Sequence, residues 1–348
     1  MRKRPFIAAR IEKQLNRRIG ATARRFGWKD TVLSYTGYGS ETRLRVMARV
    51  ILSRYGNANI KTLRQDVWAT RRGWRNFLSL PAVNRVVHVN VAGNITDALT
   101  DREGYVDLSV IHHGLSPGWH HVKITTGDSE EVQAPVLIIA NDTKFGIVSD
   151  IDDTIITSFL PRLMIAAYNA FVSTESARAP VAGMSAMYNT ILRQYPGAPL
   201  IYVSTGSWST QPFLERFIGR HSYPAGPMLL TDWGPTNTGW FRSGPAHKRQ
   251  SLASLARDFP QIRWLLVGDD GQHDPRLYAE FARKHPENVA GIAIRELPSM
   301  EQVLAHGTLS EIPTSQSRHL TVPEVRAPDG YLLLPLVQSL LTKCLGDD

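Results

Sequence analysis

Four apolar runs in the second half of the chain constrain the fold more than any other feature. They are FGIVS at 145–149, PLIYVS at 199–204, IRWLLVG at 262–268 and VAGIAI at 289–294, with helical stretches between them. Near-continuous apolar strands that alternate with helices are typical of a parallel sheet covered on both faces. Ligands of such sheets bind at the carboxyl ends of the strands, so the polar residues after each run form the candidate site.

The first half of the chain has a different period. Between about residues 43 and 140 apolar residues alternate with polar ones, and turn sequences such as VAGN and TDREG separate the runs. This pattern predicts half-buried strands and a small β-sandwich, with a possible helix near 58–68. The histidine pairs at 112–113 and 120–121 do not predict a zinc site, because adjacent strand residues point to opposite faces. The alternating residues are Leu44, Val46, Ala48, Val50 and Leu52, then Val87, Val89 and Val91, then Val106, Leu108 and Val110.

The net charge of +9 is concentrated at the start of the chain. Residues 1–30 hold ten Lys and Arg residues against Glu12 and Asp30. Apolar residues recur there at mostly four-residue spacing, which predicts an amphipathic helix lying on a surface. Three partners stay open for its basic face: solvent around a helix docked on its own protein, an anionic membrane surface reached through residues 1–25, or a nucleic acid. The apolar residues of the stripe are Phe6, Ile7, Ile11, Leu15 and Ile19.

The sequence gives few indications of the cellular compartment. Cys344 is the single cysteine, so the chain has no internal disulfide. No apolar stretch reaches the ~18 residues that a membrane span needs. We therefore expect a cytoplasmic protein, soluble or peripheral to a membrane. The apolar segment YLLLPLVQSLL at 331–341 is expected to pack on the main fold, and 308–330 has the composition of a turn-rich loop.

The stretch GIVSDIDDTIITS, at 146–158, places Asp150, Asp152 and Asp153 within four positions after an apolar run. Two carboxylates ~4 Å apart repel by ~4 kcal/mol at an effective dielectric of ~20, so this arrangement raises a pKa, recruits a cation or stays hydrated. In a continued strand the first two point the same way, which suits a nucleophile that attacks phosphorus and an acid/base partner. Thr154 and the following turn offer donors to an anion.

Other well-known acidic motifs do not account for this stretch. An EF-hand loop that begins at Asp150 would have Gly and Glu where Ile155 and Pro161 stand. An aspartic-protease DTG is absent. Helix capping would account for one Asp or Thr here, but three acidic residues in four positions exceed that need.

The ends of the next two runs supply complementary groups. IYVSTGSWST carries Ser204 just before an expected helix near Gln211, which is either a phosphate site or a simple helix cap. Lys248, in AHKRQSL, is a candidate counter-charge or a solvated lysine. LLVGDDGQHDP places Asp269, Asp270 and Asp274 after a third strand. Carboxylates from two strand ends describe a Mg²⁺ site.

This order of residues, D-x-D-x-T, then Ser, then Lys, then GDxxxxD, resembles the haloacid dehalogenase superfamily over about 145–295. The resemblance implies an α/β, Rossmann-like parallel sheet without a large cap. It implies that Asp150 is the nucleophile that forms an aspartyl-phosphate and that Asp152 is the general acid/base. It further implies that Ser204 and Lys248 hold the phosphoryl group, helped by Thr154, Thr205 and Gly206, and that Mg²⁺ is bound by Asp150, the Asp152 carbonyl, Asp269 and Asp274.

More narrowly, SDIDDTI, YVSTGSW, HK and GDDGQHDP resemble the phosphatidate phosphatases of the actin-patch-associated type and their bacterial relatives, as does YTGYGSETRLRVMARVIL. The sequences STGSW and GDDGQ stand where that family has something nearer SNSPW and GDSGQ. The phosphate loop therefore differs in detail, and either Ser204 or Thr205 is the phosphate ligand.

The spacing of the motifs bears on substrate size. Only 49 residues separate Thr154 from Ser204 and 43 separate Ser204 from Lys248, which leaves no room for a large cap domain. An open site favours a bulky or surface-bound substrate. The expected function is a Mg²⁺-dependent phosphomonoesterase that converts phosphatidate to diacylglycerol and phosphate. Two alternatives stay open: a phosphatase of soluble or macromolecular phosphates, and a non-catalytic phosphate-responsive module.

The expected domain organisation has four parts. They are a basic amphipathic segment (1–30), a β-sandwich (31–142), a haloacid dehalogenase-like phosphatase domain (143–300) and a carboxy-terminal extension that packs on the fold (301–348).

Overall fold

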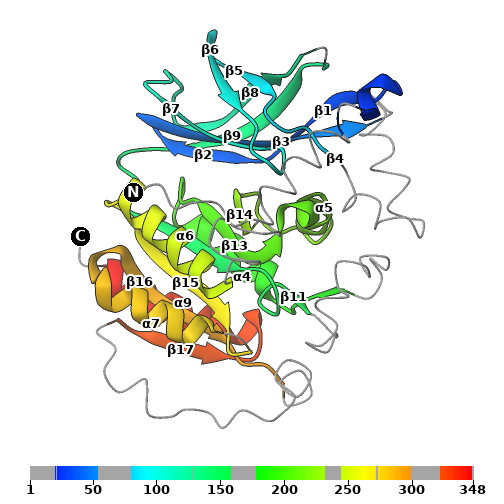
Figure 1. Ribbon diagram of the computed structural model, residues 1–348. Coiled ribbons are helices and arrows are strands. Elements are labelled where there is room, and N and C mark those ends of the chain that lie inside the picture. The colour runs from blue at the N-terminus through cyan, green and yellow to red at the C-terminus, as the bar shows by residue number, and fades with distance from the viewer. Residues whose placement is uncertain are drawn as a thin grey trace. The chain divides into compact units, whose positions relative to one another are not determined.

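Two units, divided after Ala140, make up the described part of the chain. The structure is a computed structural model that describes residues 20, 22–53, 80–127, 129–157, 178–231, 244–271, 273–298 and 322–346 (Figure 1). Most of the basic segment 1–30, with its whole apolar stripe, lies outside the described residues, as does the possible helix near 58–68.

The amino-terminal unit consists of strands in one largely antiparallel sheet. Its path runs β1-β3-β2-β9-β8-β5-β6, with β4 and β7 also paired to β3, and only the β2–β9 pair is parallel. The expected sandwich has two separate sheets, whereas here all nine described strands are hydrogen-bonded into one. The strands are β1 (Lys29–Ser34), β2 (Gly37–Ser40), β3 (Arg43–Ser53), β4 (Leu80–Pro81), β5 (Val86–Val91), β6 (Asn94–Leu99), β7 (Tyr105–Ile111), β8 (Gly118–Thr125) and β9 (Val132–Ile139).

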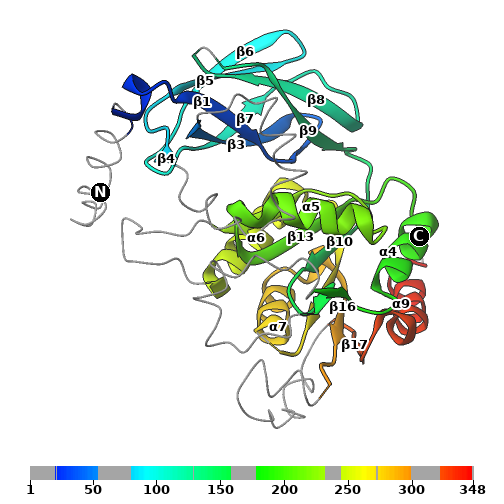
Figure 2. The ribbon, with the colours of Figure 1, turned by 90° about the vertical axis from the view of Figure 1, so that its right-hand side faces the viewer.

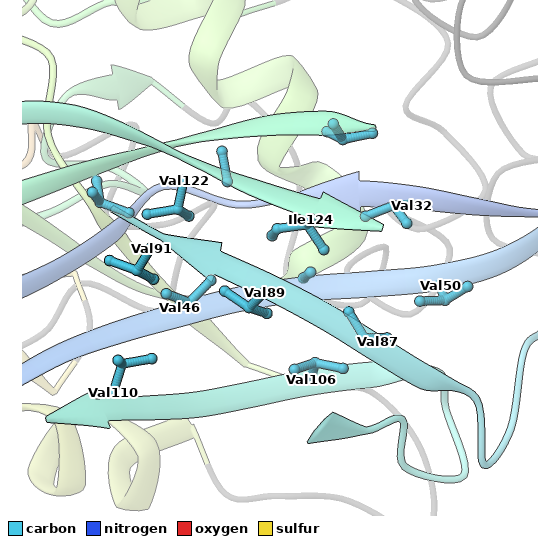
Figure 3. Packing of buried hydrophobic residues seen from close by; sticks show 14 of the residues in the cluster. Val32, Val46, Val50, Val87, Val89, Val91, Val106, Val110, Val122 and Ile124 are labelled. Atoms are coloured by element: carbon cyan, nitrogen blue, oxygen red, sulfur yellow. The ribbon is translucent and has the colours of Figure 1, made fainter. Parts of the chain in front are cut away.

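The alternating residues of the sequence form the core of this unit. The sets that begin at Leu44, Val87 and Val106 all belong to one buried cluster, in which Leu108 is partly exposed. Figure 3 shows Val46 and Val50 of β3 facing Val87, Val89 and Val91 of β5, so distant strands of the single sheet enclose the same core. The period-2 interpretation of these runs is therefore confirmed.

The carboxy-terminal unit contains a six-stranded sheet in which every pair is parallel, with the order β14-β13-β10-β15-β16-β17. Numbered along the chain this is the 3-2-1-4-5-6 order of doubly wound folds, whose ligands bind where the order reverses, here between β10 and β15. The parallel sheet expected from the four apolar runs is confirmed. Its strands are β10 (Phe145–Asp150), β13 (Leu200–Ser207), β14 (Met228–Thr231), β15 (Arg263–Asp269), β16 (Val289–Arg295) and β17 (Glu324–Ala327).

Helices cover both faces of this sheet (Figures 1 and 2). α6 packs on β13 and α7, and α7 packs on β15, while α9 packs on β16, β17 and α4 in the other helical layer. A small hairpin, β11 (Ile156–Thr157) with β12 (Ala179–Pro180), follows β10. The helices are α4 (Met184–Gln194), α5 (Gln211–Arg220), α6 (Gly244–Asp258), α7 (Asp274–Lys284) and α9 (Gly330–Leu345), with short 3₁₀ turns η4 (Trp208–Thr210) and η5 (Pro286–Asn288). Among the described helices, none combines the length and the apolar character needed to cross a membrane.

The carboxy-terminal extension is part of the sheet. Residues 324–327, which the sequence pattern assigns to a loop, form β17 and pair with β16, because backbone hydrogen bonds to a neighbouring strand do not require an apolar sequence. α9 then buries Leu333, Val337, Leu340 and Leu341 against the fold, as expected for the apolar segment.

Candidate active site

Three buried carboxylates and a lysine meet at the point where the strand order reverses. Asp150 is the last residue of β10, Asp269 is the last of β15, and Asp274 is the first of α7. One carboxylate oxygen from each lies within 4.8 Å of the others. Lys248, from α6, places its Nζ 2.7 Å from Asp150 Oδ1 and also donates to Asp274 Oδ1. The structure therefore brings together four of the residues selected from the sequence.

Burial dominates the electrostatics of this cluster. Asp150, Asp269 and Asp274 are at most 1% exposed and Lys248 is 3% exposed. Desolvation raises the pKa of Asp150 and of Asp269 well above the usual carboxyl value, and mutual repulsion with Asp274 adds to it, while Lys248 opposes it. Burial alone would lower the pKa of Lys248, but the neighbouring carboxylates outweigh this and raise it. The lysine is thus held as an ammonium ion.

The cluster fits a divalent cation. Within the described residues three carboxylates face a single ammonium group, so two negative charges lack compensation when all are ionised. Asp274 Oδ2 is buried and has no hydrogen-bond partner there. Unpaired buried carboxylate oxygens are costly unless they ligate a metal, and hard oxygen donors suit Mg²⁺. Such an ion would also favour the charged forms of Asp150 and Asp269.

Asp152 lies apart from this cluster and faces the phosphate loop. Its Oδ2 accepts a hydrogen bond of 2.8 Å from Ser204 Oγ, and Ser204 Oγ accepts one of 2.9 Å from the backbone N–H of Gly206. Asp152 is partly exposed, whereas the Ser204 side chain is buried. The side chain of this second carboxylate of the motif is therefore not among the grouped oxygens that could ligate a metal.

The two threonines of the motif regions have different surroundings. Thr154 is fully buried, and its Oγ1 lies 3.3 Å from both Asp150 Oδ2 and Asp269 Oδ2. This geometry favours a role in spacing the two carboxylates over the expected contact with substrate. Thr205 and Gly206, the other residues expected to contact the phosphate, are partly exposed beside Ser204. Whether Ser204 or Thr205 binds phosphate stays a prediction, although the hydrogen bond from Ser204 to Asp152 places the Ser204 hydroxyl next to the acid/base candidate.

Glycines allow the carboxylates to approach one another. A Cβ atom on Gly268 would lie 2.5 Å from Asp274 Oδ2 and 2.8 Å from the ring of Tyr278. A Cβ on Gly271 would lie 2.9 Å from Asp269 Oδ1, which accepts a hydrogen bond of 2.8 Å from the Gly271 N–H. The GDDG sequence thus gives α7 a close approach to the end of β15.

Arg295 is a site residue that the sequence motifs do not include. It is the last residue of β16 and only 4% exposed, and it donates to the Asp153 carbonyl at 2.6 Å and to the Pro328 carbonyl at 3.2 Å. Asp153 has a φ of 59°, a left-handed backbone conformation that is uncommon for residues other than glycine. Arg295 is the charged residue directly after VAGIAI, so the rule applied to the other three strand ends would have found it.

Known proteins are similar in sequence to the region of the chain that carries the candidate site. Phosphatidate phosphatase APP1 of Saccharomyces cerevisiae is 30% identical over 166 residues, which is 46% of this chain and 27% of the yeast protein. An uncharacterised protein of Schizosaccharomyces pombe is 28% identical over 172 residues, 48% of this chain and 27% of its own length. The chain thus spans about a quarter of the length of each of these relatives.

Solved structures resemble the chain only distantly. A crystal structure of an uncharacterised protein from Listeria monocytogenes serotype 4b has a TM-score of 0.36 and 12% identity, and the match covers 57% of this chain and 98% of that one. A similarity of this size supports no argument about fold or function. The sequence comparison is more specific: residues 145–296, which carry every carboxylate described above, match the family described as "Phosphatidate phosphatase APP1, catalytic domain".

Proposed function

We propose that this chain is a Mg²⁺-dependent phosphatase of phosphomonoesters and that its substrate is a phosphatidate-like lipid. The observation that carries the proposal is the contact of Lys248 with Asp150, which is grouped with two further carboxylates, beside the hydrogen bond from Ser204 to Asp152. The similarity of residues 145–296 to a phosphatidate phosphatase catalytic domain supports both the reaction type and the lipid substrate.

The proposed reaction has two displacements at phosphorus. Asp150 attacks the phosphoryl group and forms an aspartyl-phosphate, while the bond from phosphorus to the ester oxygen breaks and Asp152 gives its proton to the leaving alcohol. Asp152 then takes a proton from water, which attacks the same phosphorus and releases phosphate and the Asp150 carboxylate. The partly exposed position of Asp152, bonded to Ser204 and outside the carboxylate cluster, supports this division of roles.

Lys248 and the phosphate loop would hold the transferred group. The ammonium of Lys248 lies 2.7 Å from Asp150, which supports a role in neutralising a phosphoryl oxygen at the point of attack. The Ser204 hydroxyl and loop N–H groups offer further donors next to Asp152. Fixed donors of this kind stabilise charge that develops on the phosphoryl oxygens.

The carboxylates of Asp150, Asp269 and Asp274 would hold Mg²⁺, with the Asp152 carbonyl as a further ligand. The bound ion supplies positive charge that allows an anionic nucleophile to approach a phosphate dianion. Thr154 keeps Asp150 and Asp269 at a fixed spacing for this purpose.

The proposed domains follow the two units of the fold. We place the phosphatase of the haloacid dehalogenase type in residues 143–300, completed by β17 and α9 of the extension 301–348, which add to its sheet and its helical layer. The 31–142 region is a separate β-rich domain. For the whole protein we propose a cytoplasmic location with peripheral attachment to membranes, aided by the basic residues of 1–25.

A phosphate-release assay tests the function. The wild-type chain is compared with Asp150→Asn and with the matched control Asp142→Asn, an exposed carboxylate ahead of β10. Each is given phosphatidate in phosphatidylcholine vesicles and a water-soluble aryl phosphate, with Mg²⁺ or with a chelator. We expect release only with Mg²⁺, faster from phosphatidate, and at least ~10³-fold slower in Asp150→Asn.

The arms of this assay separate the alternatives. Faster release from the soluble ester would favour a phosphatase of soluble or macromolecular phosphates. Full activity of Asp150→Asn would refute its role as the nucleophile. No release from either substrate by the wild-type chain would favour a phosphate-responsive binding module.

A further inference from the structure

The outward face of α9 is apolar, although α9 lies at the surface. Tyr331 is 66% exposed, Leu332 54% and Leu336 42%, and Pro335 between them is also exposed. These four residues are called the α9 apolar face. The opposite side of the helix is buried in the fold, and no charged residue occurs between Asp329 and Lys343. A surface helix ordinarily turns charged residues to water, so an outward apolar face indicates a binding surface.

This face begins at the edge of the sheet that holds the site. β17 ends at Ala327, and Asp329 caps α9 by accepting a hydrogen bond of 2.9 Å from the Leu332 N–H. The Gly330 N–H donates to the Ala182 carbonyl at 2.9 Å. The ring of Tyr331 lies so close to Gly183 that a Cβ there would be 2.7 Å from it. The helix start is therefore fixed against the segment that precedes α4.

The residues before α9 and before α4 also contact the segment that carries the D-x-D-x-T motif. Arg295 bonds to the Pro328 carbonyl just before α9 and to the Asp153 carbonyl within the D-x-D-x-T motif. The Val181 N–H donates to the Ile155 carbonyl at 3.0 Å, directly after Thr154. A partner that binds the start of α9 would therefore lie near the carboxyl ends of the strands, where the candidate site is.

We propose that the α9 apolar face docks on a phospholipid bilayer and so presents the site to lipid-borne phosphate, an inference that rests on the proposed function. Three observations favour a bilayer over a protein partner. The exposed residues Ala179, Pro180 and Ala182 beside the helix start are uncharged and extend the apolar surface. Tyr331 combines an apolar ring with a hydroxyl, as interfacial residues do. Residues 145–296 of the same unit match a phosphatidate phosphatase catalytic domain, and phosphatidate is a lipid of the bilayer.

Vesicle binding tests the proposal. The double variant Leu332→Glu with Leu336→Glu places two carboxylates on the α9 apolar face, and both positions are exposed, so folding should be preserved. Ile111→Glu is the matched control, because Ile111 is 66% exposed but lies in the amino-terminal unit. Flotation with phosphatidylcholine vesicles that contain phosphatidate is measured at about 0.5 M salt, where electrostatic attraction is largely screened. We expect at least ~10-fold weaker binding of the double variant and unchanged binding of the control.

Activity and self-association complete the test. The double variant should lose at least ~10-fold in release from vesicle phosphatidate at low lipid concentration while its turnover of the soluble aryl phosphate is unchanged. Wild-type vesicle binding by the double variant would overturn the proposal. A concentration-dependent dimer that the double variant abolishes, with vesicle binding intact, would assign the face to a second copy of the chain. Absence of all phosphatase activity would refute the proposed function, and the flotation result would still decide the docking surface.

Discussion

At the scale of single residues, the site is defined by how its charges are paired. Asp150 and Asp274 share the ammonium of Lys248, while Asp269 receives donors from Thr154 and Gly271. Asp274 Oδ2 is the oxygen of the cluster that is buried without a hydrogen-bond partner among the described residues. That oxygen is the sharpest indication of a cation site.

Replacing Asp274 by Asn should weaken metal binding, because it removes one charge and one anionic ligand while keeping the shape. We expect the rise in melting temperature that Mg²⁺ gives the wild-type protein to require at least ~10-fold more Mg²⁺ in the variant. Calorimetric scans over a Mg²⁺ series measure this without reference to catalysis. Asp142→Asn is the control, and an unchanged Mg²⁺ dependence in Asp274→Asn would exclude Asp274 as a ligand.

Replacing Arg295 by Met should slow turnover without abolishing substrate binding, because the Asp153 carbonyl loses its donor and the loop that carries Asp152 loses a restraint. We expect a kcat reduced by roughly 10- to 100-fold with a smaller change in KM. Arg295→Lys, which keeps the charge, should recover part of the loss. Equal losses in both variants together with a large fall in melting temperature would indicate a purely structural role.

Much of the site was predictable from residue order because the carboxyl ends of parallel strands converge. Asp150 and Asp269 follow apolar runs, and their adjacency needs only a sheet in which β10 and β15 are neighbours. The buried role of Thr154 was not predictable, since a hydroxyl after a strand has the same sequence signature whether it faces substrate or carboxylates. Arg295 was predictable as well, because it directly follows an apolar run, as Asp150 and Asp269 do.

At the scale of elements, glycines decide how closely helices approach the sheet. Gly268 lets α7 bring Asp274 and Tyr278 onto the end of β15, and the Tyr278 hydroxyl donates to the Val267 carbonyl at 3.0 Å. Sequence periodicity predicted β10, β13, β15 and β16 and helical stretches between them, but it predicted neither β14 nor this contact. It also missed β17, because a four-residue strand at a sheet edge leaves little periodic signal.

Gly268→Ala should therefore disturb both the packing of α7 on β15 and the carboxylate cluster. The added Cβ lies within 2.8 Å of Asp274 and of the Tyr278 ring, so α7 must shift. We expect a loss of about 1–3 kcal/mol in the free energy of unfolding, the usual cost of overpacking, together with weaker Mg²⁺ stabilisation. Denaturant titration with and without Mg²⁺ measures both effects. Gly219→Ala in α5, where a Cβ would meet nothing within 4 Å, is the matched control and should not destabilise the protein.

The α6–α7 contact should show a pH dependence of its own. Glu280 of α7 accepts from Arg249 of α6 and from Lys284, and these hydrogen bonds lower the pKa of Glu280 to about 2. A carboxyl whose pKa is lowered on folding stabilises the folded state at pH values above its unfolded pKa, which is near 4.5 for Glu280. That contribution is lost as the pH falls toward 2. Glu280→Gln should slightly lower the melting temperature at neutral pH in low salt. Because the pair is exposed, about 0.5 M salt should remove most of the difference, and a salt-independent effect would contradict the proposed electrostatic cause.

At the scale of the whole molecule, charge and apolar surface are assigned to different parts of the chain. Residues 1–30 carry a net charge of +8, whereas the exposed residues of the α9 apolar face are uncharged. Electrostatic attraction to a membrane is screened over ~10 Å at 0.1 M salt and over ~3 Å at 1 M, while apolar burial is insensitive to salt over this range. The two contributions can therefore be separated by ionic strength.

Deleting residues 1–19 should weaken binding to anionic vesicles in low salt and should make little difference at about 0.5 M salt. The double variant of Leu332 and Leu336 should weaken binding at both. Flotation of the two proteins and their combination, over a salt series and with neutral vesicles as the reference, measures the separate contributions. Binding by the truncated protein that equals wild type in low salt would show that the basic residues face solvent or the protein itself. Loss of soluble-ester turnover on truncation would instead indicate that residues 1–19 support the catalytic unit, since a membrane tether has no part in that reaction.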